Sequence, residues 1–407
     1  MKTLLIKIGK AFTTMRREGV IKGGKRVFSA FFAMFRFVGR GDILFITGGV
    51  GDSALYRCHH TAEELEIHGF KCSITVQDNP FLPSYANKFN IFIFHRVLFT
   101  PSVAKLIKRA KQQKKEIIFE TDDLVFDPKY LTHMDYFNQM NMFEKMLYEN
   151  GVGGEILRDP YVKVCTTTTS YLADKLKEYD KKVFVSKNKL SNRDMEIANV
   201  ILSERKRVEE SNKNKIRSLD NARDDKIIKI GYFSGTLSHN KDFATIINAL
   251  TRIMEKYPQV ELFLAGPLDI ENKLNKFKNR IKQFPRVSRD KYFENISQVD
   301  INLAPLEINN PFCEAKSELK WFEAGIVGVP TVVVKNRTFS EVIKDGVDGF
   351  LAGDTEEWVG KLEKLILDEN LRREIGQKAR EKSLQNYTNK NSHNEGYYNY
   401  LRQIIDK

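Results

Sequence analysis

The segment Asn310–Val334, with the sequence NPFCEAKSELKWFEAGIVGVPTVVV, decides the fold. It predicts a strand end, a loop, a helix that opens with Lys316 and Ser317, a glycine turn and an apolar strand. An apolar strand after such a helix is typical of a parallel sheet buried on both faces. The free N–H groups at a helix start favour anions, and Lys316, Ser317 and Lys320 add two ammonium groups and a hydroxyl. The segment therefore predicts a phosphate or pyrophosphate site.

Strands and helices alternate on both sides of this segment. The chain has 407 residues, enough for two domains of ordinary size. The alternation predicts an α/β fold with two doubly wound, Rossmann-like domains. We expect an N-terminal arm at 1–40, an N-terminal domain at 41–190, a polar linker at 191–226, a C-terminal domain at 227–385, and a final helix at 386–407 that packs back on the N-terminal domain.

The net charge of +13 is concentrated at the N-terminus. Residues 1–40 carry ten Lys or Arg and one acid, so this basic arm alone contributes +9. Its phenylalanine-rich stretch, Val27–Val38, is too short to span a bilayer. A basic, amphipathic helix rich in Phe favours a segment that lies in an anionic membrane interface. The alternative is a helix that packs in the core and keeps its lysines in water.

The four cysteines are scattered and show no metal-ligand spacing. Cys58-His59-His60 is not a convincing site, because adjacent helical residues point in different directions and no second ligand cluster accompanies them. The sequence therefore predicts structural histidines, no metal site and a reducing, cytoplasmic location.

A second loop with anion-binding residues lies in the C-terminal domain. Ser234–Asp242 connects a strand to a helix, and Gly235 allows the backbone to approach a ligand closely. Thr236 and Lys241 can donate hydrogen bonds to an oxyanion. Two such loops at the strand ends of one sheet favour a phosphate site in this domain.

In the N-terminal domain, the glycine-rich loop Thr47–Ser53 joins a strand to a helix. Gly49 and Gly51 resemble a loose phosphate loop without the third glycine of Gly-x-Gly-x-x-Gly, and a tight turn is the alternative. Tyr56 and Arg57 follow in the first turns of the helix, where they can face the cleft.

Two further strands of the N-terminal domain end in polar residues, at His95-Arg96 and at Asp122-Asp123. Carboxylates at a strand end can bind sugar hydroxyls or accept a proton. The two aspartates make a poor metal pair, because neighbouring strand residues face opposite ways. A helix cap is the alternative role, which aspartate serves well. The place of Asp122 at the mouth of the sheet favours function.

Together these residues resemble glycosyltransferases of the GT-B architecture, close to glycosyltransferase family 4, also called group 1. The resemblance is carried by Glu323-Ala324, by Gly328-Val329-Pro330 and by Gly235-Thr236-Leu237 with Lys241. Within that family the chain is most similar to enzymes of bacterial surface-polysaccharide biosynthesis. The resemblance implies two Rossmann-like domains that face a cleft.

The family pattern also assigns roles to individual residues. Glu323 matches the glutamate that binds the nucleotide ribose, and Lys241 matches the lysine of the first donor loop. Ala315 stands where the family has another glutamate, Thr236 stands where it has an arginine, and Asp122 replaces a strand-end histidine. The resemblance implies catalytic roles for Asp122, Lys241 and Lys320. The implied donor-binding residues are Gly235, Thr236, Lys241, Lys316, Ser317, Lys320 and Glu323, and the implied acceptor-side residues are Gly49, Gly51, Asp52, Ser53, Tyr56, Arg57, His95 and Asp123.

The implied function is the transfer of a sugar from a nucleotide-diphosphate sugar to a glycan or lipid-linked acceptor in cell-surface polysaccharide biosynthesis. No metal, other cofactor or nucleic acid is expected, and retention of configuration is expected over inversion. The basic arm would hold the enzyme peripherally on the inner face of the membrane. Two alternatives remain, a non-catalytic GT-B partner subunit of a polysaccharide-synthesis complex and an enzyme similar to nucleotide-sugar epimerases.

Overall fold

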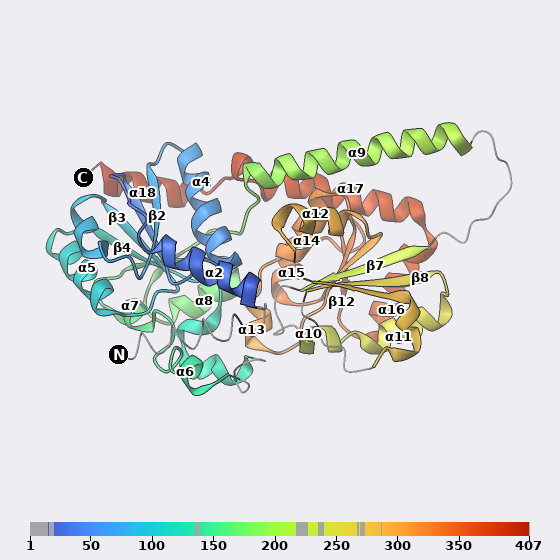
Figure 1. The fold of residues 1–407 in the computed structure, drawn as a ribbon, viewed down its shortest axis with the longest axis horizontal. Coiled ribbons are helices and arrows are strands. Elements are labelled where there is room, and N and C mark those ends of the chain that lie inside the picture. The colour runs from blue at the N-terminus through green and yellow to red at the C-terminus, as the bar shows by residue number, and fades with distance from the viewer. Residues whose placement is uncertain are drawn as a thin grey trace. The chain divides into compact units, whose positions relative to one another are not determined.

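The computed structural model describes residues 15, 20–134, 137, 140–216, 227–234, 240–266, 268, 273–285 and 287–406, and these form two compact units. Unit 1 holds the described residues up to Lys189, together with Ala315–Ser317 and the chain from Ser392 onward. Unit 2 holds Leu190–Glu314 and Glu318–Asn391. Each unit is built on a parallel sheet flanked by helices (Figure 1), so the predicted fold class is confirmed.

Unit 1 contains a six-stranded parallel sheet in the order β2-β1-β3-β4-β5-β6. Its strands are β1 (Ile43–Thr47), β2 (Cys72–Val76), β3 (Ile91–His95), β4 (Glu116–Glu120), β5 (Val164–Thr167) and β6 (Lys182–Val185). Its helices are α2 (Val20–Ala33), α3 (Asp52–Ala54), the π-helical η1 (Leu55–His60), α4 (Thr61–Ile67), η2 (Leu82–Asn87), α5 (Pro101–Gln112), η3 (Leu124–Phe126), η4 (Pro128–His133), α6 (Met142–Lys145), α7 (Gly154–Arg158), α8 (Ser170–Lys177) and α18 (Glu395–Ile405). The chain order reverses at β1, so a switch point lies between β1 and β3.

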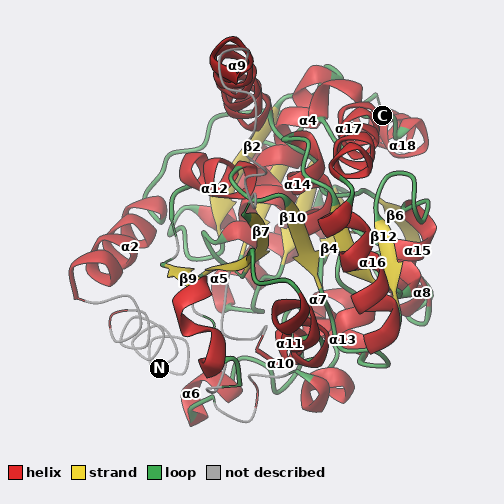
Figure 2. Cartoon of the chain, turned by 90° about the vertical axis from the view of Figure 1, so that its right-hand side faces the viewer, coloured by secondary structure: helices red, strands yellow, loops and turns green. Residues whose placement is uncertain are grey.

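Unit 2 contains a second six-stranded parallel sheet in the order β12-β11-β10-β7-β8-β9. Its strands are β7 (Ile228–Phe233), β8 (Val260–Ala265), β9 (Ile281–Phe284), β10 (Ile301–Ala304), β11 (Thr331–Val334) and β12 (Phe350–Ala352). Its helices are α9 (Asn192–Ile216), α10 (Asn240–Ala244), α11 (Ile247–Lys256), η7 (Asn275–Arg280), α12 (Arg289–Ser297), α13 (Pro311–Glu314), α14 (Leu319–Ile326), α15 (Arg337–Val342), α16 (Thr355–Leu367), α17 (Glu369–Asn386) and η8 (Asn389–Asn391). Figure 2 shows the strands, in yellow, surrounded by helices, in red.

The start of the helix in the segment Asn310–Val334 differs from the prediction. The helix does not open with Lys316 and Ser317, because α14 begins at Leu319 and these two residues lie in the connection from α13. Glu318 precedes the helix as a buried carboxylate that accepts a hydrogen bond from the Tyr387 hydroxyl at 2.7 Å. The helix therefore begins three residues later than the polar pattern, with its start at Lys316, indicates. The glycine turn is present, with Gly328 at φ +75° before β11.

The expected linker at 191–226 contains a long helix in its described part. Helix α9 runs from Asn192 to Ile216 and belongs to unit 2 (Figure 1, light green). Its apolar residues Ile197, Ala198 and Ile201 are buried, and the helix packs on α12. This segment is therefore part of a folded unit along most of its described length.

The last helix, α18, completes the core of unit 1. Tyr397, Tyr398 and Leu401 are buried among residues of β1 and α4, such as Phe45 and Leu65. The hydroxyl of Tyr398 also donates a hydrogen bond to the buried carboxylate of Glu64. The chain therefore returns to its first sheet after passing through unit 2.

No helix in the described parts of the chain combines the length and the apolar character needed to cross a bilayer. Of the basic arm at 1–40, the structure describes residues 15 and 20–40, which include α2.

Candidate active site

A pocket of about 190 Å³ opens at the carboxyl ends of β1 and β3 in unit 1. Thr47 and His95, the last residues of these strands, lie side by side in the sheet register. This is the switch point of the sheet, where doubly wound folds bind ligands. The pocket is lined by Thr47, Gly48, Gly49, Gly51, Ser53, Ala54, Gln77, His95, Arg96, Leu98, Val125, Leu147, Tyr148 and Val152.

The backbones of two loops approach each other closely at Gly48. A Cβ atom at Gly48 would lie 1.9 Å from the carbonyl oxygen of Arg96, whereas a Cβ at Gly49 would meet no heavy atom within 4 Å. Arg96 itself has a φ of +48°, which is uncommon for a residue with a side chain. The tight turn that the sequence allows for this loop therefore depends on Gly48, which was not among the predicted site residues. Gly49 and Gly51 line the open side of the pocket.

Three predicted residues come together at this pocket, where Ser53 and His95 belong to the lining and Asp122 contacts both. The Ser53 hydroxyl donates a hydrogen bond to Oδ2 of Asp122 at 2.8 Å and lies 2.9 Å from Nε2 of His95. Nε2 of His95 is 3.4 Å from Oδ1 of Asp122, and its Nδ1 is 3.3 Å from the Thr47 hydroxyl. The family resemblance implies that Asp122 takes the place of a strand-end histidine. In this structure Asp122 lies beside a histidine, His95.

Arg96 is a site residue for which the sequence indicated no role. Its Nε lies 2.6 Å from Oδ1 of Asp122, and its guanidinium also pairs with Asp123 at 3.3 Å. Burial alone would raise the pKa of Asp122, but the Arg96 charge and hydrogen bonds from His95 and Ser53 hold this pKa well below its ordinary value. Asp122 is therefore ionised at neutral pH. The signal for Arg96 is its place after a strand-end histidine.

Asp123 has the capping role that the sequence left open. Its Oδ1 accepts a hydrogen bond from the backbone N–H of Leu124 at 2.9 Å, which starts η3. Its Oδ2 pairs with Nζ of Lys316 at 3.1 Å. The Ser317 hydroxyl accepts a hydrogen bond from Nδ2 of Asn188 at 3.0 Å. Lys316 and Ser317, predicted in the donor domain, thus belong to unit 1, and their donor roles stay predictions.

The prediction that Tyr56 and Arg57 face the cleft is wrong. The π-helical turn η1 directs both side chains into unit 1, where each is buried. Arg57 makes a bidentate ion pair with Glu120, at 2.8 and 3.1 Å, and donates to the carbonyl oxygen of Ser186 at 2.8 Å. Tyr56 packs its ring edge-on against His60. An arginine with a carboxylate partner in the interior holds the sheet together and is not open to an acceptor.

Asp52 and Ser53 occupy the short helix α3 at the start of this element. Asp52 is exposed and Ser53 is half-buried at the pocket. Their positions fit the predicted acceptor side, although only Ser53 contacts Asp122 directly.

In unit 2, the predicted donor residues are described only in part, because Gly235 and Thr236 lie outside the described residues. Lys241 is an exposed residue of α10. Lys320, in the first turn of α14, has its ammonium 4.4 Å from the centre of the Tyr232 ring and 3.4 Å from the Tyr232 hydroxyl. Both lysines are placed near the carboxyl end of β7. Lys241 follows that strand in the chain, and Lys320 contacts Tyr232, which is the next-to-last residue of β7.

Glu323, the predicted ribose-binding residue, is buried in unit 2. Its side chain is 1% exposed, and its two oxygens are bonded to Arg289 at 2.6 Å and to the Tyr292 hydroxyl at 2.7 Å. Arg289 also pairs with Asp194 at 2.9 Å. In this arrangement Glu323 joins α14 to α12, and its contact with a ribose stays a prediction.

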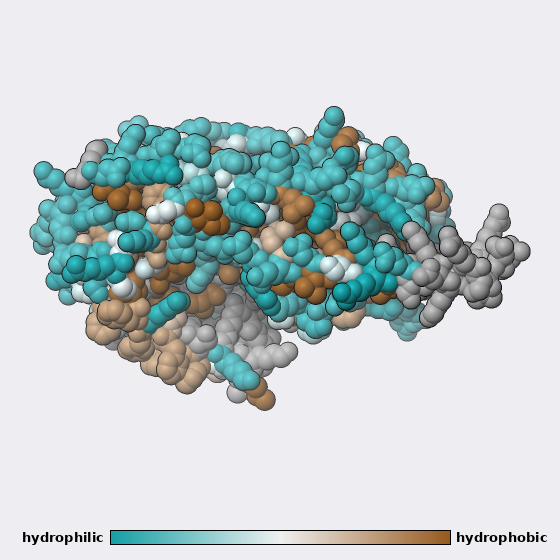
Figure 3. All heavy atoms as spheres, turned by 90° about the horizontal axis from the view of Figure 1, so that it is seen from above, coloured by the Kyte–Doolittle hydropathy of each residue, from teal (hydrophilic) through white to brown (hydrophobic). Residues whose placement is uncertain are grey.

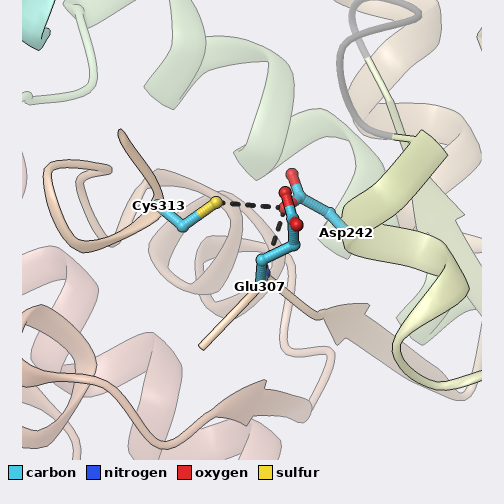
Figure 4. A group of neighbouring side chains, drawn as sticks. All are labelled: Asp242, Glu307 and Cys313. Carbon is cyan, nitrogen blue, oxygen red and sulfur yellow. Dashed lines mark hydrogen bonds between the residues drawn. The ribbon is translucent and has the colours of Figure 1, made fainter. Parts of the chain in front are cut away.

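A compact polar cluster lies beside α10. Cys313 donates a hydrogen bond from Sγ to Oδ1 of Asp242 at 3.3 Å, and the backbone N–H of Glu307 donates to the same oxygen at 3.1 Å (Figure 4). Ligand-type atoms of these three residues lie within 4.8 Å of one another. A metal ion at this cluster would require the Cys313 thiol to give up its proton. The geometry is that of a hydrogen-bonded cluster.

Comparison with known proteins agrees with this architecture. Residues 212–382 match the family described as glycosyl transferases group 1. The protein EpsD of Bacillus subtilis (strain 168) is 25% identical over 172 residues, an alignment that spans 42% of this chain and 44% of EpsD. The chain thus covers less than half the length of this curated relative.

Solved structures resemble the whole chain in fold. HepE from Anabaena, in complex with UDP and glucose, has a TM-score of 0.57 and 15% identity, and the match covers 89% of this chain and 100% of HepE. A glycosyltransferase from Rickettsia africae ESF-5 gives a TM-score of 0.57 and 14% identity, over 91% and 100% of the two chains. These structures show the fold alone; the resemblance to group 1 glycosyltransferases is confirmed for residues 212–382, and the narrower assignment to family 4 stays a prediction.

Proposed function

We propose that this chain, whose residues 212–382 match the group 1 glycosyltransferases, is itself a glycosyltransferase. It would transfer a sugar from a nucleotide-diphosphate sugar to a hydroxyl group of a glycan or lipid-linked acceptor in cell-surface polysaccharide biosynthesis. That family match carries the proposal. It is supported by polar residues at the carboxyl ends of strands in both units, where doubly wound sheets bind ligands.

Unit 2 is the donor unit in this proposal. Lys241 and Lys320 would stabilise the negative charge that develops on the leaving nucleoside diphosphate. Fixed cations can do this without a divalent metal, so we expect turnover to persist in EDTA. Glu323 would accept a hydrogen bond from a ribose hydroxyl while it keeps its bonds to Arg289 and Tyr292, because each carboxylate oxygen can accept two hydrogen bonds.

Unit 1 is the acceptor unit. Ser53 and His95 line the pocket and would offer a hydroxyl and an imidazole to an incoming sugar, and the ionised Asp122 lies directly behind them. We propose that Asp122 orients the acceptor hydroxyl and stabilises positive charge on the reacting sugar. His95 is the better placed group to take a proton, because a carboxylate with a low pKa is a weak base. Retention of configuration is the expected outcome.

Basic and aromatic residues in 1–40 support a cytoplasmic enzyme held at the inner membrane face. That location would bring unit 1 to a lipid-linked acceptor.

The test is the release of nucleoside diphosphate from a panel of nucleotide sugars. UDP-glucose is the first donor to try, since HepE has been solved with it. Lys320→Ala should lower kcat/KM by about 100-fold or more, because it removes a cation from the leaving group. Lys364→Ala, at an exposed site on α16, is the matched control and should keep full activity.

Three results would contradict the proposal. Full activity of Lys320→Ala would exclude its role at the leaving group. A folded wild-type chain that binds no nucleotide would instead be a non-catalytic partner subunit. A product that is an isomerised nucleotide sugar, identified by mass spectrometry and chromatography, would indicate an epimerase.

A further inference from the structure

Unit 1 carries an exposed row of phenylalanines beside its basic arm. Phe28, Phe31, Phe32 and Phe35, at the end of α2 and just after it, are each at least half exposed, and their rings contact one another. Apolar atoms, brown and tan, gather at the lower left of Figure 3. A water-exposed group of large apolar rings of this size indicates a surface that is covered in the working protein.

The row is fixed to the body of unit 1 through residues 36–38. The carbonyl oxygen of Arg36 accepts a hydrogen bond from Nδ2 of Asn79 at 3.0 Å, and that of Val38 accepts one from Lys88. The same Lys88 ammonium lies 4.5 Å from the centre of the Phe37 ring and 5.1 Å from that of Tyr85. Tyr85 is a buried residue of η2, so Lys88 joins the segment that follows the phenylalanine row to that element.

Helix α5 extends this surface with positive charge. It packs on η2, where Arg109 donates a hydrogen bond to the carbonyl oxygen of Pro83 at 2.8 Å. Lys105, Lys108 and Arg109 are exposed and share one face of the helix by their spacing. Phe81, before η2, and Phe99, before α5, are exposed beside them.

The charge of this region accounts for the basic character of the whole chain. Residues 101–115 contain six Lys or Arg and no acid, and residues 1–40 contribute +9. Together they carry +15 against a net +13 for the chain, which leaves −2 for all other residues. The net positive charge of the chain is therefore concentrated in residues 1–40 and 101–115.

We propose that α2, residues 34–38, η2 and α5 form one surface that docks on an anionic lipid bilayer. The phenylalanines would enter the interface between headgroups and acyl chains, and the basic face of α5 would contact acidic headgroups. This deepens the membrane association proposed above by adding a folded part of unit 1 to the arm. The aromatic rings distinguish a bilayer from a soluble polyanion, which needs only the cations.

The test is cosedimentation of the full-length protein with vesicles of phosphatidylcholine alone or with about 30% phosphatidylglycerol. The wild type should bind the anionic vesicles and lose binding as salt is raised. Lys105→Gln with Lys108→Gln should weaken that binding by about 25-fold, since one basic residue at the surface contributes about fivefold. Phe31→Ser with Phe35→Ser should weaken it by about tenfold or more. Lys344→Gln with Lys364→Gln, at exposed sites in unit 2, is the control and should bind as the wild type does.

Equal binding by the α5 variant and the control would overturn the proposal, as would no binding by the wild type. Loss in the α5 variant with full binding in the phenylalanine variant would show that the cations alone bind the vesicles, as they would bind any polyanion, and would also overturn the proposal. Turnover of nucleotide sugar with a soluble acceptor separates the two proposals. Unchanged turnover in these variants, with failed vesicle binding, contradicts the docking surface alone, whereas no turnover in the wild type contradicts the proposed enzyme.

Discussion

The buried ion pair between Arg57 and Glu120 gives Arg57 a structural role in place of the predicted acceptor-side role. Both side chains are buried, so removing one partner leaves the other as an uncompensated charge. We expect Arg57→Met to lower the free energy of unfolding of unit 1 by about 3–5 kcal/mol, measured by urea denaturation. The double variant with Glu120→Leu should recover part of that loss, because no lone charge remains. If Arg57→Met kept its free energy of unfolding but lost acceptor binding, Arg57 would have the acceptor-side role that its burial argues against.

Asp122 gives a prediction with a definite pH dependence. Its pKa is lowered in the folded state, so its ionised form stabilises the fold above the unfolded pKa of about 3.9. This stabilisation is lost as the pH falls through the lower folded value. We expect Asp122→Asn to cost about 1–3 kcal/mol at pH 7, because Arg96 loses one of its two carboxylate partners, and less at pH 3. Thermal denaturation across this range measures the difference, and a constant difference would contradict the low pKa.

At the scale of elements, the β1 and β3 loops offer a matched pair of glycines. Gly48→Ala places a Cβ 1.9 Å from the Arg96 carbonyl oxygen, so the two loops must separate. We expect the free energy of unfolding to fall by about 1–3 kcal/mol. The KM for the acceptor should rise, because His95 and Arg96 line the pocket. Gly49→Ala has open space around the added methyl group and should change neither. Equal effects in acceptor titrations would show that the crossing at Gly48 does not shape the pocket.

At the scale of the whole molecule, donor and acceptor functions are assigned to different units. A nucleoside diphosphate at about 100 times its Kd should stabilise the protein by about 2.7 kcal/mol, which is an upward shift of several degrees in Tm. Lys320→Ala, in unit 2, should reduce this shift at a fixed ligand concentration. Asp122→Asn, in unit 1, should keep the shift relative to its own unliganded Tm. Differential scanning fluorimetry with UDP, GDP and ADP measures the Tm shift of each variant. A shift that is lost in Asp122→Asn and kept in Lys320→Ala would place the donor site in unit 1.

The fold was predictable because its information is local. Apolar runs of strand length alternate with helical patterns, and β11 is the apolar strand predicted at the end of the segment Asn310–Val334. The grouping of Ser53, His95 and Asp122 was also within reach, because each follows a strand of one parallel sheet and parallel strands end at the same edge. Periodicity and strand ends are properties of short segments, which a sequence displays directly.

The sequence by itself determined two doubly wound units, the strand ends that carry polar residues and the concentration of charge near the N-terminus. Only the tertiary structure decided which of those residues stay open to a ligand. Arg57 and Glu323 read as site residues, yet each is buried against partners far away in the chain, Glu120 and Arg289. Arg96, which the sequence did not indicate, belongs to the site because it pairs with Asp122. Charge pairing in three dimensions depends on long-range packing, and no local pattern encodes it.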